Sequence, residues 1–476
     1  MESSNLVIIG AGPAALRAAI AAADAGTIPI MISSSGIGSG SSSNDLAGLA
    51  ASIDEVSSSS HRDDTIAAGG DSTDKVAAAR TCGEAVKVVA ELERWGLVFR
   101  RRDGGLPHVS QVHGHTMPRM TGCGDSTGRN ITRILEEQAM KRGVVRRSDL
   151  QPISLVMDKN QVRGITVIDI NTGQIRGIQT KAIILATEGY QGIWTSPANG
   201  AGLGASLAAD AGITLSGLSN HPHHPLTIRG TDLHLSLDLL GSGGRVRKSS
   251  GEDIDPSEAG DDDSVLDLRS IESNASVWFN QTRAQIKNRT GLDMSREVIP
   301  ISSTIATTTG GAPVDEHGRV TLSKGKKWAT GLYAAGRSAH NGMHGESLLP
   351  GNLILDDLVS GSVAGLHAGE WVKEAPFGGS NLVEKEITKS EKKIQNLRSS
   401  DGNSVGQTAA TLVSIMSSCV NGSRDENSLS TAASSLAELK LAGIKITDSS
   451  SVMNTELSTA LKLEGMISVA EQISKS

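Results

Sequence analysis

The chain opens with two apolar runs separated by an alanine-rich segment. Residues 5–9 and 28–32 are apolar and have the length of strands, and residues 14–25 between them have the composition of a buried helix. Pro29 suits the end of the second strand better than its middle. This strand–helix–strand order predicts the βαβ unit of a Rossmann-type domain.

The rest of the chain continues as a mixture of helical and strand patterns. Helical patterns cover 73–95, 128–142 and the segment from 352, and strands are expected at 161–178 (a hairpin turning at 171–173), 181–186 and 331–336. Residues 230–264 are rich in Gly, Ser and Asp, which predicts a loop-rich insertion. From about residue 384 the pattern becomes helical and polar. The chain is therefore expected to be an α/β protein that ends in a helical module.

Composition and charge narrow the function classes. The net charge of -7 over 476 residues argues against nucleic acid as a partner, because phosphate binding needs a basic face. No apolar run is long enough to span a bilayer. The three cysteines are widely spaced and form neither a disulfide framework nor a metal knuckle. We therefore expect a cytoplasmic protein in a reducing compartment.

The strongest local motif is the glycine-containing turn between the first strand and the first helix. Gly10 permits the tight turn, Gly12 lets the backbone approach a diphosphate, and Ala15 lets the helix pack closely on the strand. Pro13 and Ala14 begin a helix whose free amides attract phosphate oxygens. A ribose-binding carboxylate is missing at the end of the second strand. Ser33 or Ser34 stands there instead.

Several further segments resemble the flavoprotein subunits of succinate dehydrogenase and fumarate reductase. The resemblance rests on Asp125-Ser126-Thr127-Gly128, Ala182 to Thr187, His224-Pro225, Gly331 to Gly336, His344-Gly345, Gly351-Asn352 and Met453 to Leu457. These segments follow the order that the family has along its chain. The segment His61 to Gly70, with Asp64 and Thr65, is similar to L-aspartate oxidases, which are relatives of that family.

The resemblance implies a domain plan and an activity. It implies an FAD-binding domain (1–225 and 304–365), an inserted α+β capping domain (226–303), and a C-terminal helical domain (366–476) shorter than in the family. It implies hydride transfer between succinate or fumarate and FAD N5, an iron–sulfur partner, and a membrane anchor that would hold the protein at the inner face of the membrane. An L-aspartate oxidase-like enzyme and a catalytically impaired FAD-binding homologue are the alternatives.

The resemblance also assigns residues. Ala186, Thr187, Gly336, Asn352 and Leu353 would contact FAD, together with the turn at residues 10–15 and Ser33. FAD is expected to be non-covalent, because residues 39–53, where the family's flavin-linking histidine would fall, contain no histidine.

Three further residues are assigned to the substrate. His224 and His344 would bind it, and Arg269 would transfer the proton. Hydrogen bonding of His221 and His223 to loop backbone, and a solvated Arg269, are the alternative readings. The prolines around His224 and the lack of a carboxylate ligand disfavour a metal site.

The family's substrate-binding residues are replaced in this chain. By the resemblance, a carboxylate-clamping arginine would fall at Leu348, a histidine at Ala306, a Thr-Glu pair at Ser236 and Leu237, and a glutamate at Arg337. Charge-assisted hydrogen bonds of this kind are worth roughly 1.5–3 kcal/mol each. Turnover of succinate is therefore expected to be impaired.

Overall fold

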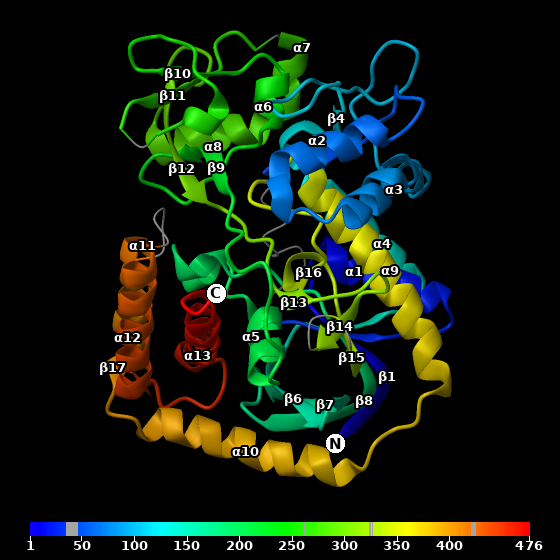
Figure 1. The fold of residues 1–476 in the computed structure, drawn as a ribbon, viewed down its shortest axis with the longest axis vertical. Coiled ribbons are helices and arrows are strands. Elements are labelled where there is room, and N and C mark those ends of the chain that lie inside the picture. The colour runs from blue at the N-terminus through cyan, green and yellow to red at the C-terminus, as the bar shows by residue number, and fades with distance from the viewer. Residues whose placement is uncertain (35–45, 261, 272, 323–324, 326, 420–424) are drawn as a thin grey trace.

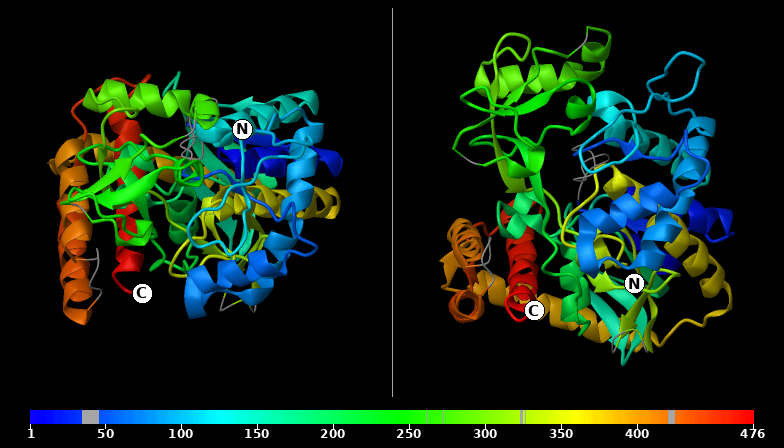
Figure 2. Two further views of the ribbon diagram at one scale, coloured as in Figure 1. Left: turned by 90° about the horizontal axis from the view of Figure 1, so that it is seen from above. Right: turned by 45° about the horizontal axis from the view of Figure 1, so that its top comes forward.

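A computed structural model describes residues 1–34, 46–260, 262–271, 273–322, 325, 327–419 and 425–476. Three regions are recognisable in Figure 1: a central sheet with its covering helices, a capping region drawn in green, and a group of helices drawn in orange and red. Figure 2 shows the same three regions from two further directions, and its right-hand view shows the capping region above the C-terminal helices.

The central sheet has a parallel core. Its path runs β14-β15-β7-β8-β1-β2-β5, with β6 paired to β7. The strands are β1 (Glu2–Ile9), β2 (Ile30–Ile32), β5 (Val145–Arg147), β6 (Leu150–Asp158), β7 (Gln161–Asp169), β8 (Ile175–Leu185), β14 (Arg319–Leu322) and β15 (Lys327–Ala334). Strands β15, β8, β1, β2 and β5 pair in parallel, in that order. The predicted Rossmann-type α/β architecture is confirmed.

One prediction about the strands is wrong. The second arm of the predicted hairpin and the predicted strand 181–186 are a single strand, β8. Its first half pairs antiparallel with β7, and it pairs in parallel with β1 over most of its length. The strand continues through Lys181 without a turn, because hydrogen bonds to β7 on one edge and to β1 on the other hold it extended.

Two helices cross the sheet region in direct contact. Helix α1 (Pro13–Asp24) packs along α9 (Asn352–Glu374). A side chain at Gly361 or Gly365 would overlap the carbonyl oxygens of Ala14 and Ala18, and one at Gly369 would crowd Ala22. The two helices therefore meet backbone to backbone.

The capping region has its own hydrophobic core. Strands β9 (His223–Ile228), β10 (Arg245–Lys248), β11 (Ser264–Asp267) and β12 (Ile299–Ile305) form a sheet in the order β10-β11-β12-β9. Helices α6 (Asp238–Gly241), α7 (Ser273–Ser276) and α8 (Asn280–Thr290) accompany it. A core that includes Leu226, Leu239, Phe279 and Ile299 joins these elements. The core lies within the segment 226–303 expected to form the cap.

The remaining helices surround this frame. They are α2 (Ser59–Gly69), α3 (Lys75–Arg94), α4 (Thr127–Lys141), α5 (Leu203–Asp210), α10 (Ser380–Ser399), α11 (Val405–Cys419), α12 (Glu426–Ala442) and α13 (Thr455–Ile473). Helix α10 packs on β6, β7 and β8, and α13 packs on α5. The predicted helical module is present. Among the described residues no helix is long and apolar enough to cross a membrane.

Candidate functional site

The turn after β1 forms one wall of a narrow cavity. Gly10 has a φ of 137°, a backbone conformation that favours glycine, and a side chain there would overlap the carbonyl oxygen of Ala186. Gly12 is the N-cap of α1 and has no side chain with which to cap the helix amides. The predicted residues that line this cavity are Gly10, Gly12, Pro13, Ala14, Ser33, Ala186 and Thr187. The arrangement fits a diphosphate at a helix N-terminus.

Two of the predicted contact residues lie behind this cavity. Ala15 is fully buried in the helix–sheet core, as its predicted packing role requires. Gly336 has a φ of 56°, and a side chain there would collide with Asp357 and Ala14. Both residues act by permitting close packing.

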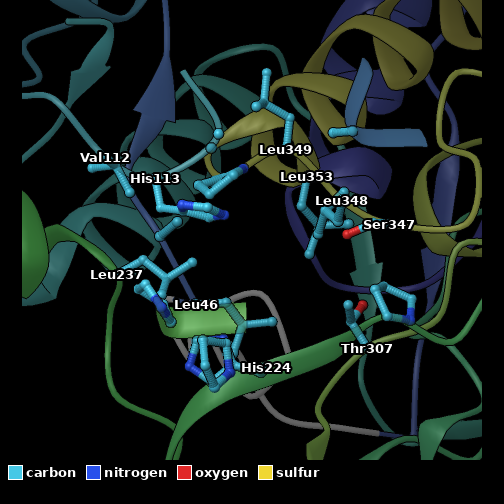
Figure 3. Close-up of a pocket in the computed structure, with 18 of the residues that line it drawn as sticks. Leu46, Val112, His113, His224, Leu237, Thr307, Ser347, Leu348, Leu349 and Leu353 are labelled. Carbon is cyan, nitrogen blue, oxygen red and sulfur yellow. The ribbon is translucent and has the colours of Figure 1, made fainter. Parts of the chain in front are cut away.

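A second, larger cavity of about 350 Å³ lies between the start of α9, the capping region and the segment around Leu46 (Figure 3). Its walls are mainly aliphatic and include Leu46, Val112, Leu237, Leu348, Leu349 and Leu353. Arg337 lines both cavities. The two cavities therefore adjoin at this side chain.

Among the described residues, Arg337 is the cation that lines both spaces. Its side chain is 5% exposed, and its guanidinium Nη2 lies 3.6 Å from Asp357 Oδ2. A buried arginine retains its charge. It can therefore interact with an anionic group placed where the cavities adjoin.

His224 lines the larger cavity as a neutral group. Its Nε2 donates to the carbonyl oxygen of Leu235 at 2.8 Å. Burial, with a smaller contribution from His234, lowers the pKa of His224 to about 3. Because Nε2 is the donor of the neutral ring, His224 Nδ1 can only accept a hydrogen bond, and the ring carries no charge with which to bind a carboxylate near pH 7.

Arg269 does not line the larger cavity. Its guanidinium Nη2 lies 2.8 Å from Asp267 Oδ2, and its side chain is 48% exposed. Asp267 is the last residue of β11 and lies two positions before Arg269 in the chain. The two side chains therefore form a local ion pair at the surface of the capping region. This position fits the alternative of a solvated surface arginine.

His344 also lies outside the cavity lining. It is buried, its Nε2 lies 3.4 Å from Asp356 Oδ2, and its carbonyl accepts from Asn220 Nδ2. The structure therefore brings only His224, of the three predicted substrate and proton-transfer residues, to the cavity.

The start of α9 is held by side chains from α2. His61 Nε2 donates to Asn352 Oδ1 at 2.7 Å, and Asn352 Nδ2 donates to Thr65 Oγ1 at 2.9 Å. The Asn352 side chain is thus engaged away from the cavity, whereas Leu353 and Ile354 line it. Any contact of Asn352 with a cofactor would come from its backbone.

A buried ionic network supports the same loop. Arg119 is fully buried and binds the carboxylates of Glu55 and Asp64. Arg119 also lies 3.3 Å from His115 Nδ1, and His115 Nε2 donates to the carbonyl oxygen of Pro350 at 2.9 Å. Burial lowers the pKa of His115 to about 4, so its ring is neutral. The network fixes residues 350–352, where α9 begins.

The positions at which the expected substrate-binding residues are replaced lie at or beside the larger cavity. Leu237 and Leu348 both line it, and Ala306 is buried next to Thr307, which also lines it. The cap reaches this cavity through a backbone hydrogen bond from Leu237 N to Leu46 O at 3.0 Å. Among the described residues no cluster of three potential metal ligands is present.

Comparison with known proteins gives consistent results over the whole chain. Residues 5–354 match the family model described as FAD binding domain, and residues 409–476 match the one described as fumarate reductase flavoprotein C-term. The succinate dehydrogenase flavoprotein subunit of Rickettsia bellii is 25% identical, covering 98% of this chain and 86% of that protein. The fumarate reductase flavoprotein subunit of Mycobacterium tuberculosis is 26% identical, covering 99% and 89%.

A solved structure, that of E. coli quinol fumarate reductase FrdA with one substitution, has the same fold. It superposes with a TM-score of 0.90 at 23% identity and covers 100% of this chain and 89% of that one.

Proposed function

Since the chain belongs to the FAD-binding family of succinate dehydrogenase and fumarate reductase flavoprotein subunits, we propose that it catalyses hydride transfer between its substrate and FAD N5. FAD is the cofactor of this family, and its members are oxidoreductases that act on succinate and fumarate. The reaction class assigned here is the oxidation or reduction of a CH–CH unit.

The observation that carries the proposal is the pair of adjoining cavities. The narrow one has the glycine turn and helix N-terminus that suit a diphosphate, and the larger one begins at α9. The amides at the N-terminus of α9 suit the partial negative charge at the flavin N1 and C2 carbonyl. When bound, FAD supplies the two-electron acceptor. The chain orients it and excludes water.

FAD is proposed to be bound without a covalent link. Residues 39–53 offer no histidine for such a bond. Acid precipitation of the purified yellow protein should release the flavin into the supernatant. Colour that stays in the pellet would contradict non-covalent binding, and folded protein that takes up no FAD would contradict the proposed function itself.

Electrons are proposed to leave through partner subunits. Proteins similar to this chain are named as flavoprotein subunits of succinate dehydrogenase and fumarate reductase. We therefore expect an iron–sulfur subunit and a membrane anchor, and a peripheral position at the inner face of the membrane. Affinity purification of the tagged chain from its own cells should recover an iron–sulfur protein.

A catalytically impaired FAD-binding homologue is the second candidate, and the leucines at positions 237 and 348 favour it. Dye reduction by the FAD-loaded protein separates the possibilities. Succinate-dependent reduction supports turnover of the family's substrate. Aspartate-dependent peroxide would support the oxidase alternative. Bound flavin that no electron donor reduces would support the impaired homologue.

A further inference from the structure

We propose that Lys462, which belongs to the C-terminal helices, binds the diphosphate of FAD in the narrow cavity. The inference rests on the proposed function, because it adds a binding residue to the same cofactor site. Lys462 lies on α13 and lines the narrow cavity together with the glycine turn that follows β1. The C-terminal helices thus take part in holding the cofactor, although none of the contact residues expected from the sequence belongs to them.

Two contacts fix α13 against the FAD-binding domain, one on each side of Lys462. Before it, Gln151 Nε2 on β6 donates to the carbonyl oxygen of Ser458 at 3.1 Å. After it, Gly465 lies so close to Ser206 of α5 that a side chain at Gly465 would overlap that serine. The backbone of Lys462 is therefore held beside the cavity, and only its flexible side chain has to adjust to a ligand.

The ammonium group of Lys462 is not engaged elsewhere in the described part of the chain. The side chain is partly buried, and its Nζ forms no hydrogen bond or ion pair with a described residue. Two glutamates of α13 are already paired, since Glu464 lies 3.1 Å from Lys393 and Glu471 lies 2.7 Å from Lys440. Lys462 is therefore available to an anionic ligand.

The other charges around the narrow cavity leave a need for this cation. Arg337 and Asp357 both line the cavity and lie 3.6 Å apart, so their charges offset each other. Glu188 also lines it and adds a negative charge. The N-terminus of α1 contributes only about half a positive charge. Without Lys462, a diphosphate with a negative charge on each phosphate would face a wall that is itself negative.

No other cation is at hand for this role. Among the described residues that line the narrow cavity, the cations are Arg337 and Lys462. Residues 35–45, which follow the second strand, contain no Arg, Lys or His. A lysine suits the task because its ammonium group is a compact charge with three donors on a flexible stem, which can follow the oxygens of either phosphate.

The first test measures the affinity for FAD and does not rely on turnover. Ultrafiltration of the FAD-loaded protein at a series of dilutions separates free from bound flavin and gives the dissociation constant. Lys462→Met should raise this constant at least about tenfold, whereas Lys462→Arg, which keeps the charge, should change it less than about threefold.

Lys475→Met is the matched control, because Lys475 is exposed just beyond the end of α13 and does not line the narrow cavity. It should leave the dissociation constant unchanged. Equal affinity of Lys462→Met and Lys475→Met for FAD, or equal weakening by Lys462→Arg and Lys462→Met, would overturn the inference. A wild type that takes up no FAD would instead contradict the proposed function.

A second experiment separates binding of the diphosphate from neutralisation of Glu188. If Lys462 binds the diphosphate, Lys462→Met should still weaken FAD binding at least about fivefold in a chain that also carries Glu188→Gln. If Lys462 only offsets the charge of Glu188, Lys462→Met should have no effect in that background, and the inference is wrong. Glu188→Gln alone should strengthen FAD binding, because it removes a negative charge from the cavity wall.

Discussion

Replacing Asp238 by asparagine should stabilise the protein above neutral pH. Asp238 begins α6 of the capping region, directly after the residue whose amide binds Leu46 O. Its carboxyl accepts from the backbone amide of Gly48, and its Oδ1 has no hydrogen-bond partner among the described residues. Burial raises the pKa of Asp238 from 3.8 to about 7.

The magnitude follows from linkage. The unfolded carboxyl is ionised above pH 3.8, whereas the folded one keeps its proton until about pH 7, so its contribution to stability is lost as the pH rises between these values. At about 1.36 kcal/mol per pH unit, the full cost at pH 8 is about 4 kcal/mol. Asparagine cannot ionise and can still present an oxygen to Gly48. The Asp238→Asn variant should therefore be more stable at pH 8 by up to about 4 kcal/mol, and this advantage should be about 2.5 kcal/mol smaller at pH 5.

The assay is urea unfolding followed by tryptophan fluorescence at pH 5 and pH 8. Asp103→Asn is the control, because Asp103 is exposed and the same charge is removed. A variant that is less stable than the wild type at both pH values, or an advantage that does not depend on pH, would refute the reasoning.

Three further perturbations act on the cofactor turn and on the network beneath α9. Gly10→Ala should abolish FAD uptake, because its side chain would overlap Ala186 O, and the ratio of flavin to protein absorbance measures this. Arg119→Met should lower the free energy of unfolding by about 3–5 kcal/mol, because it leaves two buried carboxylates without their cation; an unchanged Tm would count against the network. The unfolded His115 imidazole takes up a proton below its ordinary pKa of 6.5, whereas the folded ring stays neutral down to its pKa of about 4. The free energy of unfolding of the wild type should therefore fall as the pH drops from 6.5 toward 4. Urea titrations should show a smaller loss for His115→Gln.

The parts of the fold that the sequence predicts are those with a local pattern. Strand β1, helix α1 and the turn between them combine an apolar run, a glycine pair and a helix start within 25 residues, and all lie where expected. Helix α2 was not predicted. Its buried residues His61, Asp64 and Thr65 are polar and contact partners that are distant in sequence. The helix therefore has no apolar stripe by which the sequence could reveal it.

The candidate site was predictable only in part, for the same reason. The glycine turn is a local motif, whereas Arg119 and Glu55 are 64 residues apart, and no pattern at either position marks a buried ion pair. Thr307 likewise has no distinguishing sequence context, and only the three-dimensional arrangement shows that this residue lines a cavity. Arg269 follows an acidic run, which already favoured a surface position, and the structure pairs it with Asp267.

The backbone contact between α1 and α9 has a consequence for how this protein can vary. The N-terminus of α1 lies at the cavity proposed for the diphosphate, and that of α9 lies at the cavity proposed for the flavin. Because glycines 361, 365 and 369 leave no side chain between the helices, their spacing cannot be adjusted by exchanging one residue for a larger one. The distance between the N-termini of α1 and α9 therefore does not depend on the side chains of the cavity wall. Leucines can replace polar residues of that wall without altering the length of cofactor that fits between the two N-termini.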